Sequence, residues 1–392
     1  MKTSSSLIGQ PAKNIDTPAL VIDLDAMERN LATMAAFASR HKVLLRPHAK
    51  MHKSATLALM QIKAGASGVC VQKTSEAEAL VAAGVHNVYI SNEVIAAGKL
   101  ARVAALTRIT QAQGGKIALC VDSIEGIQRL ALSMNEARLS SGVATLIDVF
   151  IELNVGHNRC GVEPGPAAVA LALEIRKYPA LNFAGLQAYH GRAQHLRDPA
   201  ERRAAITHAI SAVVQTRQLI EAEGIQVKLV TGAGTGTAAL EAASGVYGEL
   251  QAGSYLFMDA DYAANKLDPA QPRFEHALFV KTQVISTHAG DDPYAVCDAG
   301  HKSHAIDSGL PKVHAFSSRS KLEYFNGGDE HGLLRPAAGS HRLPSLGSML
   351  WLIPGHCDPT VNLHDMMVGV RGGLLDGVVE SLIAVDARGA LT

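Results

Sequence analysis

The segments NFAGLQAY (182–189) and KLVTG (228–232) are two short runs that flank a long amphipathic stretch at 199–223. Both runs are apolar along their length and do not alternate with polar residues, which is typical of parallel strands buried on both faces. The intervening stretch is rich in alanine, as expected of a helix that connects one parallel strand to the next. Together they predict a strand–helix–strand unit.

The same unit recurs throughout the region from Val43 to Phe257. Eight strand-like runs occur there, with longer helix-like stretches between them: VLLR (43–46), GVCV (68–71), NVYIS (87–91), KIALCV (116–121), IDVFIEL (147–153), NFAGLQAY (182–189), KLVTG (228–232) and ELQAGSY (249–255). This repetition predicts an α/β protein with a (β/α)8 TIM-type barrel. An open doubly wound sheet is the alternative, but eight regular units favour the barrel.

The two ends of the chain have a different pattern. ALVIDLD (19–25) predicts a strand that enters a helix, with Asp25 and Glu28 spaced as in a capping box. Beyond residue 265, strand-like pieces are separated by glycine, proline and aspartate: HALFVKTQVIST, YAVCDAG, KLEYFN and MLWLIP. We therefore predict a barrel over 25–265 and a mostly-β domain formed by 1–24 and 266–392.

The composition excludes several classes of function. Lys plus Arg and Asp plus Glu each number 36, so the chain predicts no basic face for nucleic acid or for anionic lipid. No apolar stretch is long enough to predict a membrane span, and MKTSSSLIGQPAKN lacks the apolar core of a secretory signal. Five cysteines without framework spacing predict reduced thiols and a cytoplasmic protein.

The loops that follow barrel strands are where function is expected. After the first strand, RPHAKMHKS (46–54) places Lys50 between His48 and His52. A lysine there can form a Schiff base with a carbonyl cofactor if its neighbours lower its pKa. Taken alone, the segment is better explained as a solvated loop of lysine and histidine.

Two small-residue turns follow the seventh and eighth strands. TGAGTGT (231–237) feeds a helix, and AGSY (252–255) closes the last unit. Such turns let backbone N–H groups surround a phosphate, and barrels often bind phosphate with this pair of loops. Neither turn has the spacing of a dinucleotide fingerprint or a P-loop. The pair predicts a cofactor that carries a phosphate, although each turn alone could be only a tight turn.

The fifth and sixth loops add further polar groups. NVGHNRCG (154–161) directs Arg159 to the barrel mouth, and QAYHGRAQH (187–195) supplies Tyr189, His190 and His195. The chain has 17 histidines, so only the position of His195 on this loop makes it a candidate for catalysis.

PGHCDPT (354–360) is the sharpest local motif outside the barrel. In an extended stretch, residues two apart share a face, so His356 and Asp358 would converge while Cys357 points away. One imidazole and one carboxylate suit Mn²⁺ or Mg²⁺ completed by water. A turn bounded by prolines is the alternative. The polar cluster VCDAGHKSHAIDSG (296–309) could border a substrate pocket or be only turns.

These motifs resemble those of the fold-type III pyridoxal-phosphate enzymes of the D-threonine aldolase and D-serine dehydratase group, relatives of alanine racemase. The resemblance runs from DTPALVIDLDAMERN at 16–30 to VDARG at 385–389 and includes LQAGSYLFMDADY. It implies that Lys50 is the Schiff-base lysine, that Arg159 bonds the cofactor's phenolic oxygen and that Tyr189 meets its pyridine nitrogen. It also implies that Gln72 lines the pocket. The phosphate would be surrounded by Thr235, Gly236, Thr237, Gly253, Ser254 and Tyr255.

The resemblance also implies the metal site and the reaction. His356 and Asp358 would bind the metal, and a carboxylate where the dehydratases have a cysteine favours Mn²⁺ or Mg²⁺ and the aldolase branch. We therefore expect retro-aldol cleavage of D-threonine or a similar D-β-hydroxy-α-amino acid to glycine and an aldehyde, with His195 or a metal-bound water as the base. The alternatives are a D-serine or D-threonine dehydratase and a D-3-hydroxyaspartate aldolase. Similar enzymes are homodimers in which the partner's β domain completes the site.

Overall fold

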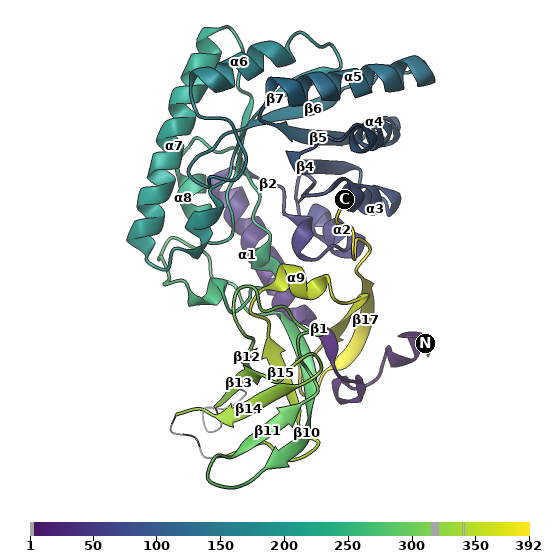
Figure 1. Cartoon of the computed structure of the whole chain (residues 1–392), viewed down its shortest axis with the longest axis vertical. Helices are drawn as coiled ribbons and strands as arrows, with labels where there is room; N and C mark the ends of the chain where they lie inside the picture. Colours follow the sequence, from purple (N-terminus) through teal and green to yellow (C-terminus); the bar gives the residue numbers. More distant parts are fainter. Residues whose placement is uncertain (1–3, 315–320, 339, 341) are drawn as a thin grey trace.

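A computed structural model of the chain describes residues 4–314, 321–338, 340 and 342–392. It consists of a barrel and a β-rich part that meet at a narrow waist (Figure 1). All eight strands predicted in the barrel are present and parallel: β2 (Leu44–Leu45), β3 (Val69–Val71), β4 (Asn87–Glu93), β5 (Lys116–Val121), β6 (Ile147–Glu152), β7 (Leu181–Ala188), β8 (Leu229–Gly232) and β9 (Glu249–Leu250). This confirms the predicted fold class.

The barrel strands lie in the order β2-β9-β8-β7-β6-β5-β4-β3. The circle closes beyond the end of β2, where His48 and Cys70 form a parallel bridge and the Cys70 amide donates to the Pro47 carbonyl at 2.8 Å. Because the closure lies one residue from Ala49 and two from Lys50, it fixes the loop that carries the candidate lysine.

Helices on the outside of the barrel follow seven of these strands: α2 (Ala55–Lys63), α3 (Thr74–Ala82), α4 (Ala97–Ala112), α5 (Ile124–Ser141), α6 (Pro166–Ile175), α7 (Pro199–Ala222) and α8 (Ala238–Ala243). The chain leaves the barrel after β9. The remaining place is taken by α1 (Leu24–His41), which precedes β2 and contacts both β2 and α8.

The start of α1 differs from the predicted capping box. Asp23 is the N-cap, and its Oδ1 accepts from the Ala26 amide at 3.1 Å. Asp25 and Glu28 instead accept hydrogen bonds from Arg371, at 2.9 and 2.7 Å. The carboxylates of Asp25 and Glu28, which were predicted to cap the helix, therefore form ion pairs with Arg371 of the β-rich part.

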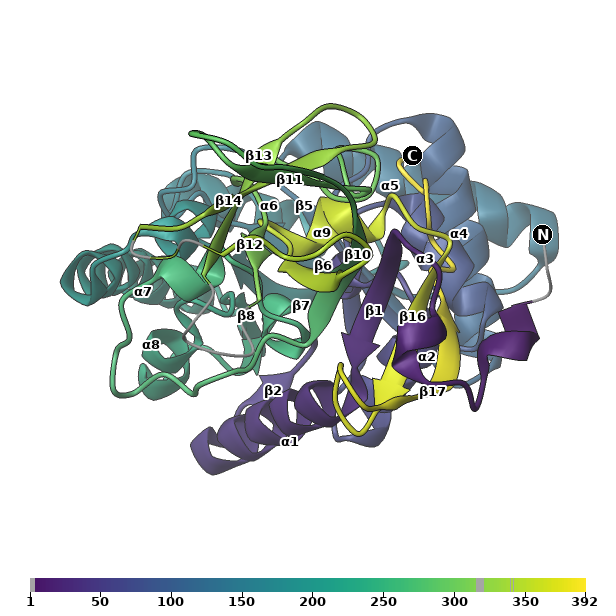
Figure 2. The ribbon, with the colours of Figure 1, turned by 90° about the horizontal axis from the view of Figure 1, so that it is seen from below.

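The β-rich part is a nine-stranded sheet in which β1 (Ala19–Asp23) pairs with both β10 and β16. The four predicted strand pieces form β10 (Leu278–His288), β11 (Tyr294–Cys297), β13 (Leu322–Asn326) and β15 (Met349–Ile353). The sequence did not predict β12 (Lys312–Val313), β14 (Gly332–Pro336), β16 (Met366–Arg371) and β17 (Val378–Ala384). The short helix α9 (Cys357–Val361) lies between the sheet and the barrel, near the centre of the view from below (Figure 2).

The last residues of the chain, 385–392, return to the barrel. Lys53 donates through Nζ to the Ala387 carbonyl at 3.3 Å, and Asp386 Oδ2 accepts from the Ala55 amide at the start of α2 at 2.7 Å. These bonds connect the carboxyl-terminal segment to the residues directly after Lys50.

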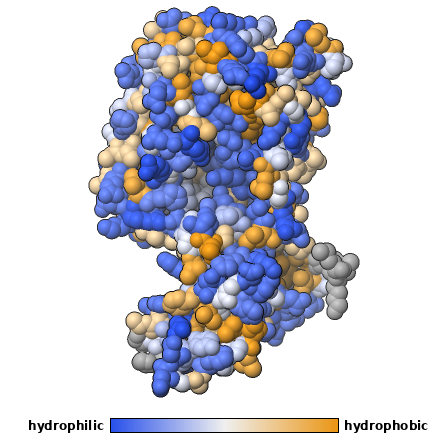
Figure 3. Space-filling model, viewed as in Figure 1, coloured by the Kyte–Doolittle hydropathy of each residue, from blue (hydrophilic) through white to orange (hydrophobic). Residues whose placement is uncertain are grey.

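The face in Figure 3 mixes polar and apolar residues and shows no continuous apolar belt. None of the helices in the described part of the chain is both long and apolar enough to span a bilayer.

Candidate active site

A cavity of about 280 Å³ lies at the carboxyl ends of the barrel strands and is closed on one side by the start of α9. Ten of the predicted site residues line it: Lys50, Gln72, Arg159, Tyr189, His195, Thr235, Gly253, Ser254, His356 and Asp358. Barrel loops and the β-rich part therefore both contribute walls to the same space.

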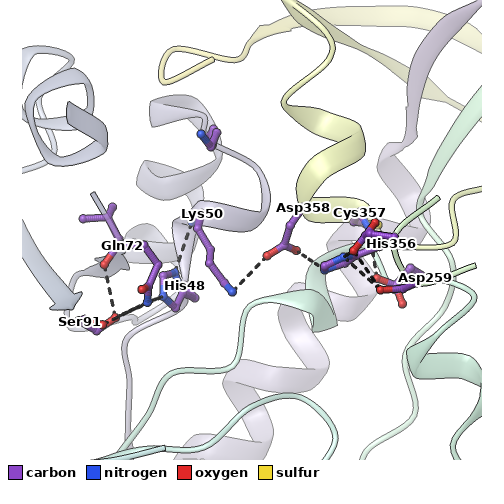
Figure 4. Close-up of polar contacts among 12 residues, drawn as sticks. His48, Lys50, Gln72, Ser91, Asp259, His356, Cys357 and Asp358 are labelled. Atoms are coloured by element: carbon purple, nitrogen blue, oxygen red, sulfur yellow. Dashed lines mark hydrogen bonds and ion pairs between the residues drawn. The ribbon is translucent and has the colours of Figure 1, made fainter. Parts of the chain in front are cut away.

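Lys50 lies on the short 3-10 helix Ala49–Met51, which packs against α9. Its side chain is 40% exposed, and its Nζ lies 3.4 Å from Asp358 Oδ2 (Figure 4). Burial would lower the pKa of Lys50, but the Asp358 carboxylate outweighs that effect and raises it. The expectation that neighbouring groups lower this pKa was wrong because Asp358 lies so close.

His48, Gln72 and Ser91 form a hydrogen-bonded wall beside Lys50 (Figure 4). Gln72 Nε2 lies 2.9 Å from His48 Nε2 and donates to the Ser91 carbonyl at 3.1 Å. Burial lowers the pKa of His48 well below its ordinary value, so the ring is neutral near pH 7. From the sequence, His48 could be identified only as a neighbour of Lys50, because no nearby residue indicates that its ring is buried.

Arg159 and Tyr189 also line the cavity. Arg159 Nη2 lies 3.9 Å from Glu152 Oε1, and the ring of Tyr189 meets His157 edge-on with 6.1 Å between centroids. Arg159 therefore brings a positive charge to the cavity, while burial raises the pKa of the neighbouring Glu152 to about 8.

The two small-residue turns meet at one end of the cavity. Thr235 Oγ1 accepts from the Tyr255 amide at 3.0 Å, which leaves the hydroxyl proton as a donor. A Cβ at Gly253 would lie 2.8 Å from the His48 carbonyl oxygen, so a larger residue would force the loops apart. This end of the cavity is lined by Ala233, Gly234, Thr235, Gly253 and Ser254.

Three residues predicted around the phosphate do not line this cavity. Gly236 faces a neighbouring cavity, and the buried Tyr255 hydroxyl accepts from Gln61 at 3.1 Å. The buried Thr237 hydroxyl donates to Glu241 Oε1 at 2.8 Å. The side chains of Thr237 and Tyr255 therefore support the loop from behind.

Burial raises the pKa of Glu241 from 4.5 to about 8, although the Thr237 hydrogen bond opposes the rise. The folded protein therefore binds one more proton than the unfolded chain between these pH values, and stability falls as pH rises through that window. Glu241→Gln is expected to remove this slope and to stabilise the protein by up to a few kcal/mol above pH 8. Urea unfolding from pH 4 to 9 measures the free energy of unfolding and its slope with pH. Glu136→Gln, a change at an exposed residue, is the control. Equal slopes in the two variants would contradict the assignment.

His356 and Asp358 lie together, but not on an extended strand as predicted. His356 is the N-cap of α9 and Asp358 is in its first turn, where Pro359 is tolerated because the amides of the first turn have no partner within the helix. His356 Nε2 lies 3.7 Å from Asp358 Oδ1, which is buried and accepts no hydrogen bond from any described residue. Cys357 is buried, and its Sγ points to the Met258 carbonyl at 3.4 Å.

The sequence did not identify Asp307 as part of this site. Asp307 Oδ2 lies 2.6 Å from His356 Nδ1. Since a carboxylate can only accept, Nδ1 carries a proton, and Nε2 is the ring nitrogen that faces Asp358. The cluster at 296–309, interpreted as a possible pocket border, contains this residue. Among the described residues, no group of three or more His, Cys, Asp or Glu side chains is arranged to hold a metal.

His195 ends the 3-10 helix Gly191–His195 and reaches the cavity from the loop after β7. Its Nδ1 lies 2.6 Å from Asp261 Oδ2, and its side chain is 51% exposed.

This arrangement matches known proteins over nearly the whole chain. The model of the alanine racemase N-terminal domain matches residues 22–261, and that of the putative serine dehydratase domain matches residues 277–370. The D-threonine aldolase of an Arthrobacter species is 45% identical over 381 residues, which are 97% of this chain and 95% of that protein. The chain belongs to the D-threonine aldolase family.

Other members of the wider group are also similar. A 3-hydroxy-D-aspartate aldolase of Paracoccus denitrificans is 40% identical, over 98% of this chain and 95% of that protein. Among solved structures, the D-threonine aldolase from Filomicrobium marinum superposes with a TM-score of 0.91 at 45% identity, covering 98% of this chain and 99% of that one. The D-threo-3-hydroxyaspartate dehydratase from Delftia sp. HT23 gives 0.82 at 26% identity, covering 95% and 98%.

Proposed function

We propose that the chain is a pyridoxal-phosphate- and divalent-metal-dependent D-threonine aldolase, which cleaves D-β-hydroxy-α-amino acids to glycine and an aldehyde. The observation that carries this proposal is the position of Lys50 Nζ, 3.4 Å from Asp358 and across one cavity from the small-residue turns. The Lys50 amine, which can bind a cofactor, and the Asp358 carboxylate, which can bind a metal, thus line the same substrate-sized cavity.

The residues present fit pyridoxal phosphate. Lys50 extends into the cavity, while the turns at 233–235 and 253–254 offer a narrow end with hydroxyl donors for a phosphate. Arg159 and Tyr189 line the same cavity and supply polar groups for the ring. Because Gly236, Thr237 and Tyr255 do not line this cavity, we propose that Thr235, Gly253 and Ser254 make the direct phosphate contacts.

The pair of His356 and Asp358 fits a hard divalent cation. Metal bonds of about 2.0–2.2 Å each to nitrogen and oxygen can span the 3.7 Å between Nε2 and Oδ1. The buried Oδ1 without a hydrogen-bond partner is an acceptor that a cation would satisfy. Two protein ligands leave positions for water and substrate, so we propose Mn²⁺ or Mg²⁺.

When bound, pyridoxal phosphate supplies an electron sink at the substrate Cα, and the cation lowers the pKa of the β-hydroxyl. Lys50 provides the amine that holds the cofactor, and Arg159 orients its ring. His195 Nε2 accepts the β-hydroxyl proton. The electron pair of that O–H bond becomes the carbonyl bond of the aldehyde, while the pair of the Cα–Cβ bond stays on Cα. Cα then takes a proton to give glycine.

A second candidate substrate is D-3-hydroxyaspartate. Arg192 and His157 line the same cavity, and a guanidinium there could pair with a second carboxylate. The similarity to 3-hydroxy-D-aspartate aldolase agrees with this alternative.

We also propose that the protein is a cytoplasmic homodimer whose partner subunit completes the site, as the resemblance implies. The five cysteines are free, and four of them are buried, which agrees with a reducing compartment. Light scattering after size-exclusion chromatography gives the oligomeric state.

The first assay uses the purified protein with pyridoxal phosphate, Mn²⁺ and D-threonine, with L-threonine and a chelator as controls. Glycine and acetaldehyde from the D-isomer, lost with chelator, would support the proposal. Ammonia and 2-oxobutanoate would make the protein a dehydratase. Comparison of kcat/KM for D-threonine and D-3-hydroxyaspartate decides between the two aldolase substrates.

A further inference from the structure

The segment Asp259–Tyr262, which follows the last barrel strand, runs beside the segment that carries the proposed metal ligands. The Ala260 amide donates to the Pro354 carbonyl at 3.0 Å, and the Asp261 amide donates to the Gly355 carbonyl at 3.2 Å. Asp259 Oδ2 accepts from the Cys357 amide at 3.2 Å. The backbone of Asp261 is therefore held in register with His356.

The Asp261 carboxylate is fixed from two sides. Oδ2 lies 2.6 Å from His195 Nδ1, and Oδ1 accepts from Arg197 Nη2. Arg197 Nη1 also donates to the Asp261 carbonyl and to Asn265 Oδ1, both at 2.7 Å. The Asp261 side chain is only 9% exposed, so these contacts define its orientation.

The charge of Asp261 determines which nitrogen of His195 carries a proton. Burial would raise the pKa of Asp261, but hydrogen bonds from His195 and Arg197 outweigh it and lower the pKa to about 2. An ionised carboxylate can only accept, so the proton of neutral His195 lies on Nδ1. Nε2 then keeps its lone pair, on a ring that lines the cavity.

We propose that Asp261 is a positioning residue for the aldol cleavage. It holds His195 in the Nδ1–H tautomer, directs Nε2 at the β-hydroxyl, and places this base at a set distance from the metal pair through its backbone bond to Gly355. The inference rests on the proposed function. It goes beyond that function in two ways. It assigns Asp261 as the group that holds His195 ready to act as a base, and it assigns Asp259–Tyr262 as the segment that aligns this base with the metal pair.

A merely structural role for Asp261 would be to anchor Arg197 and the loop at 195–197. The two roles differ in one respect: an anchor matters whether or not residue 195 is a histidine, whereas a positioning residue acts only through that imidazole.

The test compares Asp261→Asn, His195→Gln and the double variant as holoenzymes with Mn²⁺ and D-threonine. Asp261→Asn is expected to lower kcat about 10²-fold, the scale of general-base catalysis, with KM changed less than about threefold because substrate binding is untouched. In the His195→Gln background the same change should cost less than about threefold. Asp292→Asn, an exposed change in the β-rich part, is the matched control and should leave kcat unchanged.

A kcat of Asp261→Asn within about threefold of the parent, or equal losses in both backgrounds, would overturn the proposal. Nitrogen-15 NMR of the histidine rings in the unmodified holoenzyme gives a readout that needs no stable Asp261 variant, with His195→Gln used to assign the signal. Neutral His195 should carry its proton on Nδ1, and a proton on Nε2 would also overturn the proposal. If the unmodified protein does not cleave D-threonine, the proposed function fails, whereas the tautomer still reports on Asp261 separately.

Discussion

Lys50→Ala is expected to abolish aldol cleavage and to remove the visible absorbance of lysine-bound pyridoxal phosphate. Among the described residues that line the cavity, Lys50 is the one primary amine, and its Nζ lies 3.4 Å from Asp358, where cofactor, metal and substrate would meet. Removing a residue that acts covalently costs kcat on the order of 10⁴-fold or more. Product analysis and an absorption spectrum of the same sample measure both effects.

The control for Lys50→Ala is Lys63→Ala, because Lys63 is exposed at the end of α2, shortly after the same loop. That variant should keep parental absorbance and activity. A Lys50→Ala protein with unchanged visible absorbance would place the cofactor lysine elsewhere.

Asp358→Ala is expected to separate metal binding from cofactor binding. The change removes one of the two proposed protein ligands. Loss of a residue that only hydrogen-bonds to a metal ligand lowers metal affinity roughly 10–100-fold, so the Mn²⁺ affinity of this variant should fall at least that far. Metal-dependent kcat should fall by about 10²-fold or more. The absorbance of bound cofactor should persist because Lys50, Thr235 and Ser254 remain.

Calorimetric titration with Mn²⁺ measures the affinity change directly, without relying on activity. Asp365→Ala is the matched control, since Asp365 follows α9 and pairs with Arg388 at the surface. An Asp358→Ala variant that keeps full activity would remove the metal pair from the mechanism.

The barrel could be predicted because its strands are buried on both faces and therefore appear in the sequence as apolar runs. The β-rich part was less predictable. The short strand β12 depends on pairing with β15, which is distant in the sequence, and little in its own two residues indicates it. The same reason explains Asp25, whose carboxylate binds Arg371 on β16, more than 300 residues away.

The candidate site divides in the same way. Loops that follow buried strands could be located from the sequence, so Lys50 and Arg159 were placed at the cavity correctly by position. Partners that come from other elements could not. The bond of Asp307 to His356 joins two loops of the β-rich part, and that of Asp261 to His195 joins the loops after β9 and β7. Only the folded chain shows that these carboxylates fix the orientation of the two rings.

The bonds between Lys53 and Ala387 and between Asp386 and Ala55 have a consequence for the timing of maturation. The loop that carries Lys50 is synthesised long before the segment that secures it. The loop therefore lacks these restraints until residues 386 and 387 have been made, so on the proposed function the cofactor reaches its final setting only after they have packed against the barrel.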